Sequence, residues 1–315
     1  MQKSSPGALR RMSRTLLESL IGRVARDSLF KQTARREQRA VDLVRGFSRS
    51  YSSLFVEAAD FTHLRARAAF FILGNGATVN SLSKSDFSVM DEGFSVGLNG
   101  WPLHPYLPNV YSFEFGNDAE PVDDQLRTLV ARALSKADRH PTPVMFLRPS
   151  SRKLPHVATW LESLDARRLW FYGRANLVTR RAENVERDLR VALRYLARGK
   201  RDSVLLDNGA SVVRMISLAL LSGFKEIVLA GVDLNHSQYF WFDEDFIERH
   251  GDFRQSYPRA ASDSQLTLST ENRPFSTYEV ICALATVAET DYRAQIFVAR
   301  EGQALSADLP TYRFV

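Results

Sequence analysis

The chain has 315 residues, of which 44% are hydrophobic and 25% are charged, and its formal net charge is +6. These values are ordinary for a globular protein and allow one large α/β domain with an appendage. A single cysteine, Cys282, excludes an internal disulfide and a Cys-based zinc site. No apolar run is long enough to cross a bilayer, and the N-terminus lacks the hydrophobic block of a secretory signal. We therefore expect a cytoplasmic protein.

Residues 1–67 are expected to form a basic, helical N-terminal arm. Apolar residues fall on one helical stripe at 16–24 and on another at 40–44, and Gly46 with residues 48–53 interrupts the pattern. This predicts two helices that pack on the body or on a second subunit, which would make a homo-oligomer. Residues 1–69 hold fourteen Lys and Arg against six Asp and Glu. Such an arm indicates either an anionic partner, which would be a membrane face, nucleic acid or an acidic protein, or simply a solvated basic helix.

From residue 68 onward, short apolar runs alternate with helical patterns. The strands that we expect cover Ala68–Leu73, Phe94–Asn99, Asn109–Phe115, Pro143–Pro149, Leu169–Arg174, Lys225–Leu234 and Ala294–Ala299. The helices that we expect cover Asp123–Ala137, Glu183–Ala197, Ser211–Ser222 and Tyr278–Glu289. The alternation predicts an α/β fold over residues 68–315, with a mostly parallel, Rossmann-like sheet flanked by helices. The polar, poorly periodic stretch at about 243–273 predicts an active-site lid.

Candidate ligand-binding residues follow the expected strands directly. Gly74-Asn75-Gly76 follows the first one, where glycines let backbone amides approach a phosphate and Asn75 can both donate and accept hydrogen bonds. Asn99 ends the next strand, where it either holds a ligand or caps a turn. Ser211 begins a helix, where it either faces the cleft or caps that helix. Asp233 ends a later strand, where it either binds a ligand or anchors the following loop.

Three segments together resemble the bacterial sialyltransferases of glycosyltransferase family 42. They are FFILGNGATVNSLSKSDF, FSVGLNGW and NGASVVRMISLALLSGFKEIVLAGVDLN. Their order and spacing agree with the family over roughly residues 68–115 and 205–300. Members of this family are single-sheet enzymes with a lid. They use a CMP-activated nonulosonic acid without requiring a metal, so the resemblance implies a CMP-sugar donor, a glycan acceptor and no required cofactor.

The resemblance also implies roles for individual residues. Asn75 and Asn99 would hold the donor phosphate and sugar, while Ser211 and the turn Gly231–Asp233 would contact the cytidine nucleotide. Tyr239 would hydrogen-bond the leaving phosphate, whose developing charge such donors stabilise. The predicted nucleotide-binding residues are Gly74, Asn75, Gly76, Ser211, Gly231, Asp233 and Tyr239.

Two departures from the family affect the predicted catalytic set. The lid histidine that acts as general base in the family is replaced by Arg273, which cannot accept a proton. The base is then another residue, with Glu271, His250, Asp252 and His236 as candidates, or the transfer is a retaining one through a carboxylate nucleophile. Residues 114–116 replace an Asn-Pro-Ser segment, so Kdo is as reasonable a sugar as sialic acid. The predicted catalytic residues are Asn75, Asn99, Glu271, His236 and Arg273.

The sequence therefore predicts a bacterial glycosyltransferase of polysaccharide biosynthesis, which moves an acidic sugar at the cytoplasmic membrane face. Residues 1–67 would contact anionic lipid, and no nucleic acid would be bound. One alternative is an ATP- and magnesium-dependent phosphotransferase of the hydroxymethylpterin diphosphokinase (MptE-like) type. That reaction needs carboxylates near the phosphate turn, such as Asp86 and Asp91. The other alternative is a transferase-like binding protein without catalysis, which the missing lid histidine supports.

Overall fold

An eight-stranded sheet of parallel strands forms the centre of the protein, in the order β6-β5-β4-β3-β2-β1-β7-β8. The computed structural model describes residues 6–47, 69–115, 124–136, 144–147, 157, 160, 164, 169–179, 182–198, 204–235, 238–257 and 275–314. The strands are β1 Phe70–Leu73, β2 Phe94–Leu98, β3 Val110–Phe113, β4 Val144–Leu147, β5 Leu169–Asn176, β6 Val204–Asp207, β7 Glu226–Ala230 and β8 Gln295–Val298. The α/β prediction is confirmed, and each predicted strand is present; β6 was not predicted.

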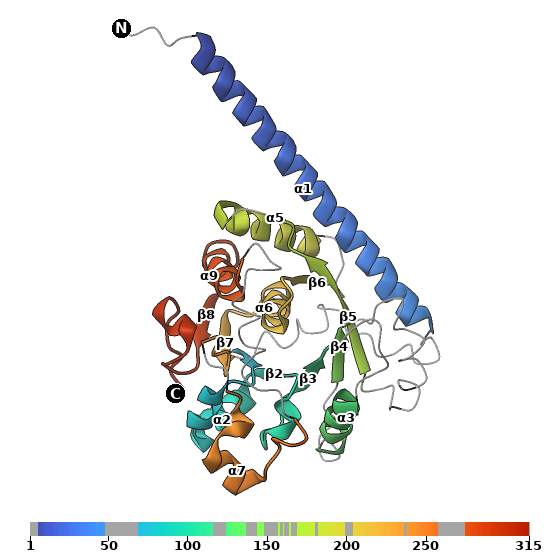
Figure 1. Ribbon diagram of the computed structural model, residues 1–315, viewed down its shortest axis with the longest axis vertical. Helices are drawn as coiled ribbons and strands as arrows, with labels where there is room; N and C mark the ends of the chain where they lie inside the picture. The colour runs from blue at the N-terminus through green and yellow to red at the C-terminus, as the bar shows by residue number, and fades with distance from the viewer. Residues whose placement is uncertain are drawn as a thin grey trace.

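Helices cover both faces of the sheet (Figure 1). They are α1 Pro6–Phe47, α2 Lys84–Glu92, α3 Asp124–Lys136, α5 Val185–Arg198, α6 Ser211–Ser222, α7 Glu244–His250 and α9 Thr277–Val287. Short turns of helix are η3 Ala77–Ser81, η4 Trp101–Leu103, η6 Ala182–Asn184, η7 Phe240–Phe242, η8 Ala288–Tyr292 and η9 Ala304–Ala307. The helix α2, which was not predicted, begins at a capping box in which Ser83 and Asp86 bond each other's backbone amides.

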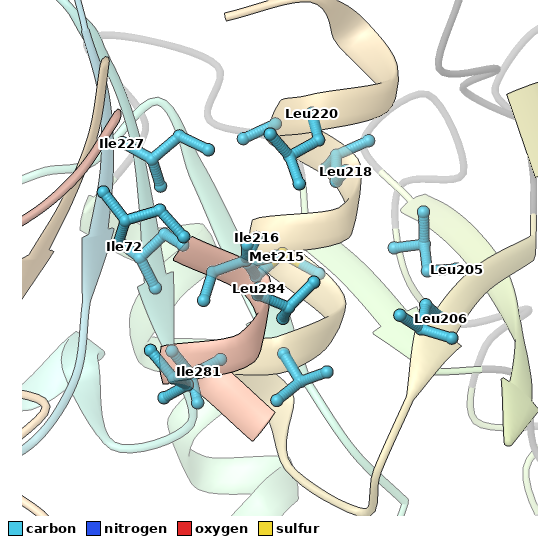
Figure 2. Close-up of a cluster of buried hydrophobic side chains, with 14 of the residues drawn as sticks. Ile72, Leu205, Leu206, Met215, Ile216, Leu218, Leu220, Ile227, Ile281 and Leu284 are labelled. Atoms are coloured by element: carbon cyan, nitrogen blue, oxygen red, sulfur yellow. The ribbon is translucent and has the colours of Figure 1, made fainter. Parts of the chain in front are cut away.

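Two apolar layers form because side chains of the buried strands alternate between the two faces. On one face, α6 lies against the sheet, and its side chains meet those of β1, β6, β7 and α9 (Figure 2). On the other face, aromatic residues of β3, β4, η4 and η7 form the second layer together with α3 and α7. The two layers hold the carboxyl ends of the strands at one edge of the sheet.

A single long helix, α1, carries both apolar stripes of the N-terminal arm (Figure 1). Its later part packs on β5 and α5, where Phe30, Ala34 and Val41 are buried. Arg35 donates to the Tyr195 hydroxyl of α5 at 3.2 Å. The two stripes therefore lie on one continuous helix, where the sequence predicts two helices, and residues 48–68 lie outside the described residues. Within the part of the chain that the structure describes, no helix has both the length and the apolar character needed to cross a bilayer.

The predicted irregular lid begins with a helix, so the sequence prediction is wrong over residues 244–250. Asp243 caps α7 by accepting a hydrogen bond from the Phe246 amide at 2.9 Å. Phe246 is buried among aromatic side chains, which ties α7 to the body. The local cap and one buried anchor therefore outweigh the polar composition of the stretch. Residues 258–273 of the predicted lid lie outside the described residues.

Candidate functional site

The carboxyl ends of β1 and β7 lie at a topological switch point of the sheet. From β1 the chain proceeds through β2 to β6 on one side, whereas β7 and β8 lie on the other side. Ligands of open α/β sheets bind at such a point, outside the carboxyl ends of the strands. The loop Gly74-Asn75-Gly76 follows β1 and the turn Gly231–Asp233 follows β7, so both predicted segments meet here.

The glycines of these two segments pack the loops against each other. A Cβ on Gly74 would lie 2.4 Å from the carbonyl oxygen of Gly231, and a Cβ on Gly76 would lie 2.4 Å from the Asp233 carboxylate. Gly231 also has a φ of +66°, which favours glycine. The Gly76 amide donates to the Gly231 carbonyl at 2.8 Å. The structure therefore explains these glycines by loop-to-loop packing, where the sequence suggested close approach to a phosphate.

Asn75 and Asn99 lie on neighbouring strand ends at the same edge of the sheet. Leu73 pairs with Gly97, and each asparagine comes two residues later. The Oδ1 atom of Asn75 is buried without a hydrogen-bond partner, 3.5 Å from where a Cβ of Gly100 would lie. Asn99 is exposed and has a φ of 47°, in the left-handed region that asparagine tolerates. The two residues thus come close together at this edge, and their roles stay predictions.

Tyr239 lies directly over the loop after β1. It forms an antiparallel bridge with Gly76, and the next amide, of Phe240, donates to the Asn75 carbonyl at 2.9 Å. The Tyr239 ring stacks on Trp241 with a centroid distance of 4.6 Å. Trp241 in turn lies beside Gly100, since a Cβ there would be 2.8 Å from its ring. Tyr239 is therefore fixed beside the predicted phosphate turn, as its predicted role requires. Sequence reasoning did not identify Trp241.

Asp233 has a structural partner. Its carboxylate is 3% exposed and accepts hydrogen bonds from the Thr78 amide, at 3.0 Å, and from the Thr78 hydroxyl. This contact anchors η3, and thereby the loop after β1, to the end of β7. Of the two roles considered for Asp233, the geometry favours loop anchoring over contact with a ligand.

Ser211 does not cap α6. Residue 210 is the N-cap, and the Ser211 hydroxyl donates to Glu114, which follows β3. Arg214, one turn further along α6, is fully buried and pairs with both Glu114 and Asp207. Its Nη1 atom lies 2.5 Å from Asp207 Oδ1. Sequence reasoning missed Arg214, although one arginine within an otherwise apolar helix is a signal of a buried ion pair.

The two carboxylates suggested for the phosphotransferase alternative, Asp86 and Asp91, belong to α2. Asp86 is 6% exposed, caps α2 and pairs with Arg300. Asp91 lies on the exposed side of α2. Among the described residues, no group of three or more His, Cys, Asp or Glu could hold a metal ion.

His104 lies buried beneath η4 and η7, where it stays uncharged. Its ring is 5% exposed, stacks on Trp101 at 4.6 Å and accepts the Tyr106 amide hydrogen at Nδ1. Burial lowers the pKa of His104 to about 3, with smaller contributions from Lys136 and His250. Burial, with smaller contributions from Arg249 and Lys136, also lowers the pKa of His250, a candidate base.

The remaining predicted catalytic residues are His236, Glu271 and Arg273, and they lie outside the described residues. Their roles stay predictions. Two surface cavities lie away from the switch point. One is next to the amino end of β1 and is lined by Phe71 and Tyr312, and the other lies between α9 and β8. We give them no part in the site, because the predicted residues gather at the opposite edge of the sheet.

No protein-family model and no curated protein matches this chain. Among solved structures, it is similar to the sialyltransferase CstII from Campylobacter jejuni in complex with the substrate analogue CMP-3FNeuAc. The TM-score is 0.43 at 15% identity, over 78% of this chain and 87% of that chain. A CstII variant in complex with CMP matches with a TM-score of 0.43 at 14% identity, over 78% and 86%. The resemblance is remote.

Proposed function

We propose that this protein is a glycosyltransferase that takes a sugar from a CMP-sugar donor and transfers it to a hydroxyl group of a glycan. The observation that carries this proposal is the meeting of three segments, distant in sequence, at one edge of the sheet. The loop Gly74–Gly76, the strand end at Asn99 and the turn Gly231–Asp233 are the parts that resemble family 42. An acidic sugar, sialic acid or Kdo, is the donor sugar that this resemblance favours.

The reaction breaks the bond between the anomeric carbon and the phosphate oxygen of the donor. CMP leaves with the electron pair, the acceptor oxygen bonds to the anomeric carbon, and the hydroxyl proton passes to a base. In this proposal the Asn75 side chain stabilises the departing phosphate, because its amide can donate hydrogen bonds at the switch point. Tyr239 is held beside it and offers a second donor.

Nucleotide binding is the first test. A bound ligand stabilises the folded protein by mass action, so we expect CMP to raise the melting temperature more than CDP, UDP, GDP or ATP. Release of CMP from CMP-sialic acid or CMP-Kdo then tests the transfer itself. Stabilisation by ATP with magnesium, without any response to CMP, would instead support the diphosphokinase alternative.

The alanine variants of Asn75 and Asn99 separate an enzyme from a binding protein. An enzyme loses turnover in both variants, whereas a non-catalytic protein has no turnover to lose and keeps its partner. Gln295→Ala is a matched control, because this exposed amide side chain lies at the amino end of β8, away from the strand carboxyl edge.

We also propose that the N-terminal arm docks this enzyme on the cytoplasmic membrane face. On α1 the exposed side chains include Arg23, Lys31, Arg35, Arg36 and Arg39. Each basic residue near an anionic surface contributes about 1 kcal/mol of binding. Co-sedimentation with phosphatidylglycerol vesicles tests this, with phosphatidylcholine vesicles as the control. Equal binding to both kinds of vesicle, or to neither, would contradict it.

A further inference from the structure

Glu114 lies at the carboxyl edge of the sheet, at the level of the predicted ligand-binding residues. Leu98 pairs with Ser112, so Glu114 lies level with Gly100, the residue after Asn99. Its side chain points to the face covered by α6, where it meets Ser211. About one third of the side chain, 34%, remains exposed. Glu114 is therefore an accessible carboxylate beside the proposed site.

An alternating row of charges fixes this carboxylate in place. Arg174 lies 3.7 Å from Asp207, Asp207 bonds Arg214, and Arg214 bonds Glu114. Asp207 and Arg214 are fully buried, so the row runs under the first turn of α6 and reaches solvent at Glu114. The Arg214 guanidinium is permanently charged, and its ion pair holds the Glu114 carboxylate in place.

The contacts of Glu114 with Ser211 and Arg214 involve the same carboxylate oxygen. Oε1 accepts from both the Ser211 hydroxyl and Arg214, which leaves Oε2 on the exposed side. A carboxylate paired with a buried arginine is a strong hydrogen-bond acceptor. It also carries negative charge at the N-terminus of α6, where an unoccupied helix end would attract a phosphate. The group that docks here is then a hydrogen-bond donor without negative charge.

We propose that Glu114 is a hydroxyl-binding residue, whose Oε2 accepts hydrogen bonds from a pair of neighbouring hydroxyls on the nucleotide-sugar. This inference rests on the proposed function. A vicinal diol has two sources in such a ligand: the ribose of the nucleotide and the sugar that it carries. Charged hydrogen bonds of this kind discriminate strongly, because a ligand without the hydroxyl leaves the acceptor unpaired.

The test measures dissociation constants by isothermal titration for CMP, 2′-deoxy-CMP and CMP-N-acetylneuraminic acid. The proteins are the unaltered chain, Glu114→Gln and the control Glu289→Gln. Glu289 makes the same change of charge at an exposed position after α9, toward the amino edge of the sheet. Circular dichroism checks folding, and Glu114→Asp, which keeps the charge beside Arg214 but shortens the side chain, replaces Glu114→Gln if that variant does not fold.

We expect Glu114→Gln to reduce one of two affinity ratios by about 10- to 100-fold: the preference for CMP over 2′-deoxy-CMP, or the preference for the CMP-sugar over CMP. Glu289→Gln should change neither ratio. If the ribose supplies the diol, the unaltered chain prefers CMP to 2′-deoxy-CMP, and Glu114→Gln removes that preference. If the sugar supplies it, the variant removes the preference for the CMP-sugar over CMP. A folded variant that preserves both preferences overturns the inference. If the unaltered chain binds no CMP, the proposed function itself fails, and the inference fails with it.

Discussion

Replacing Arg214 with methionine tests whether the buried row of charges stabilises the fold. The substitution keeps an unbranched apolar stem but leaves two carboxylates without the cation between them. Asp207 is fully buried, and the contacts that it would retain include the Gly209 amide, at 2.8 Å, and Arg174, at 3.7 Å. Removing one partner of a buried ion pair costs about 3–5 kcal/mol.

In a protein of this size, each kcal/mol corresponds to roughly 2–4 °C of melting temperature. We therefore expect Arg214→Met to melt roughly 6–20 °C lower in a thermal scan followed by circular dichroism. Adding Asp207→Asn removes the buried charge that has lost its partner, so the double variant should recover part of the loss. The matched control is Arg194→Met, because Arg194 is 60% exposed and pairs with Asp291 at 2.8 Å. Exposed pairs of this kind contribute at most about 1 kcal/mol. If both single variants melt within about 2 °C of each other, the reasoning is wrong.

Three further predictions follow from single contacts. Gly76→Ala should lower the unfolding free energy, measured by urea unfolding, by about 1–3 kcal/mol, because its Cβ would meet the Asp233 carboxylate. The control Gly22→Ala, in α1, should be neutral or stabilising. Asn75→Ala should keep the melting temperature of the free protein within about 2 °C, because the Asn75 Oδ1 has no partner to lose. It should abolish stabilisation by CMP, because it removes the proposed phosphate contact. A large loss of stability would contradict this. The pKa of His104 is lowered to about 3 in the folded state, so only the unfolded chain binds this proton between pH 6 and 3. As the pH falls through that range, the free energy of unfolding should therefore decrease by up to about 1.4 kcal/mol per pH unit from this group. His104→Phe should flatten this pH profile, and an unchanged slope would refute the assignment.

The alternation of apolar strands and helices was sufficient to predict the α/β fold, because buried parallel strands are nearly continuous apolar runs. It also predicted that Asn75 and Asn99 share an edge, since parallel strands end on the same side. The strand β6, VLLD, was missed because its apolar run is shorter than the roughly four to eight residues that indicate a buried strand. The helix α7 was missed because its polar composition concealed a local cap at Asp243.

Tertiary structure alone decided which polar residues have partners within the protein. The Thr78–Asp233 contact joins residues 155 positions apart, and the Arg214–Glu114 contact joins residues 100 positions apart. Sequence spacing contains no information on such pairs, because they depend on which strand lies beside which. The sequence therefore determined the kind of sheet and the edge at which the candidate residues gather. The order of strands determined that Asp233 anchors a loop and that Glu114 pairs with Arg214.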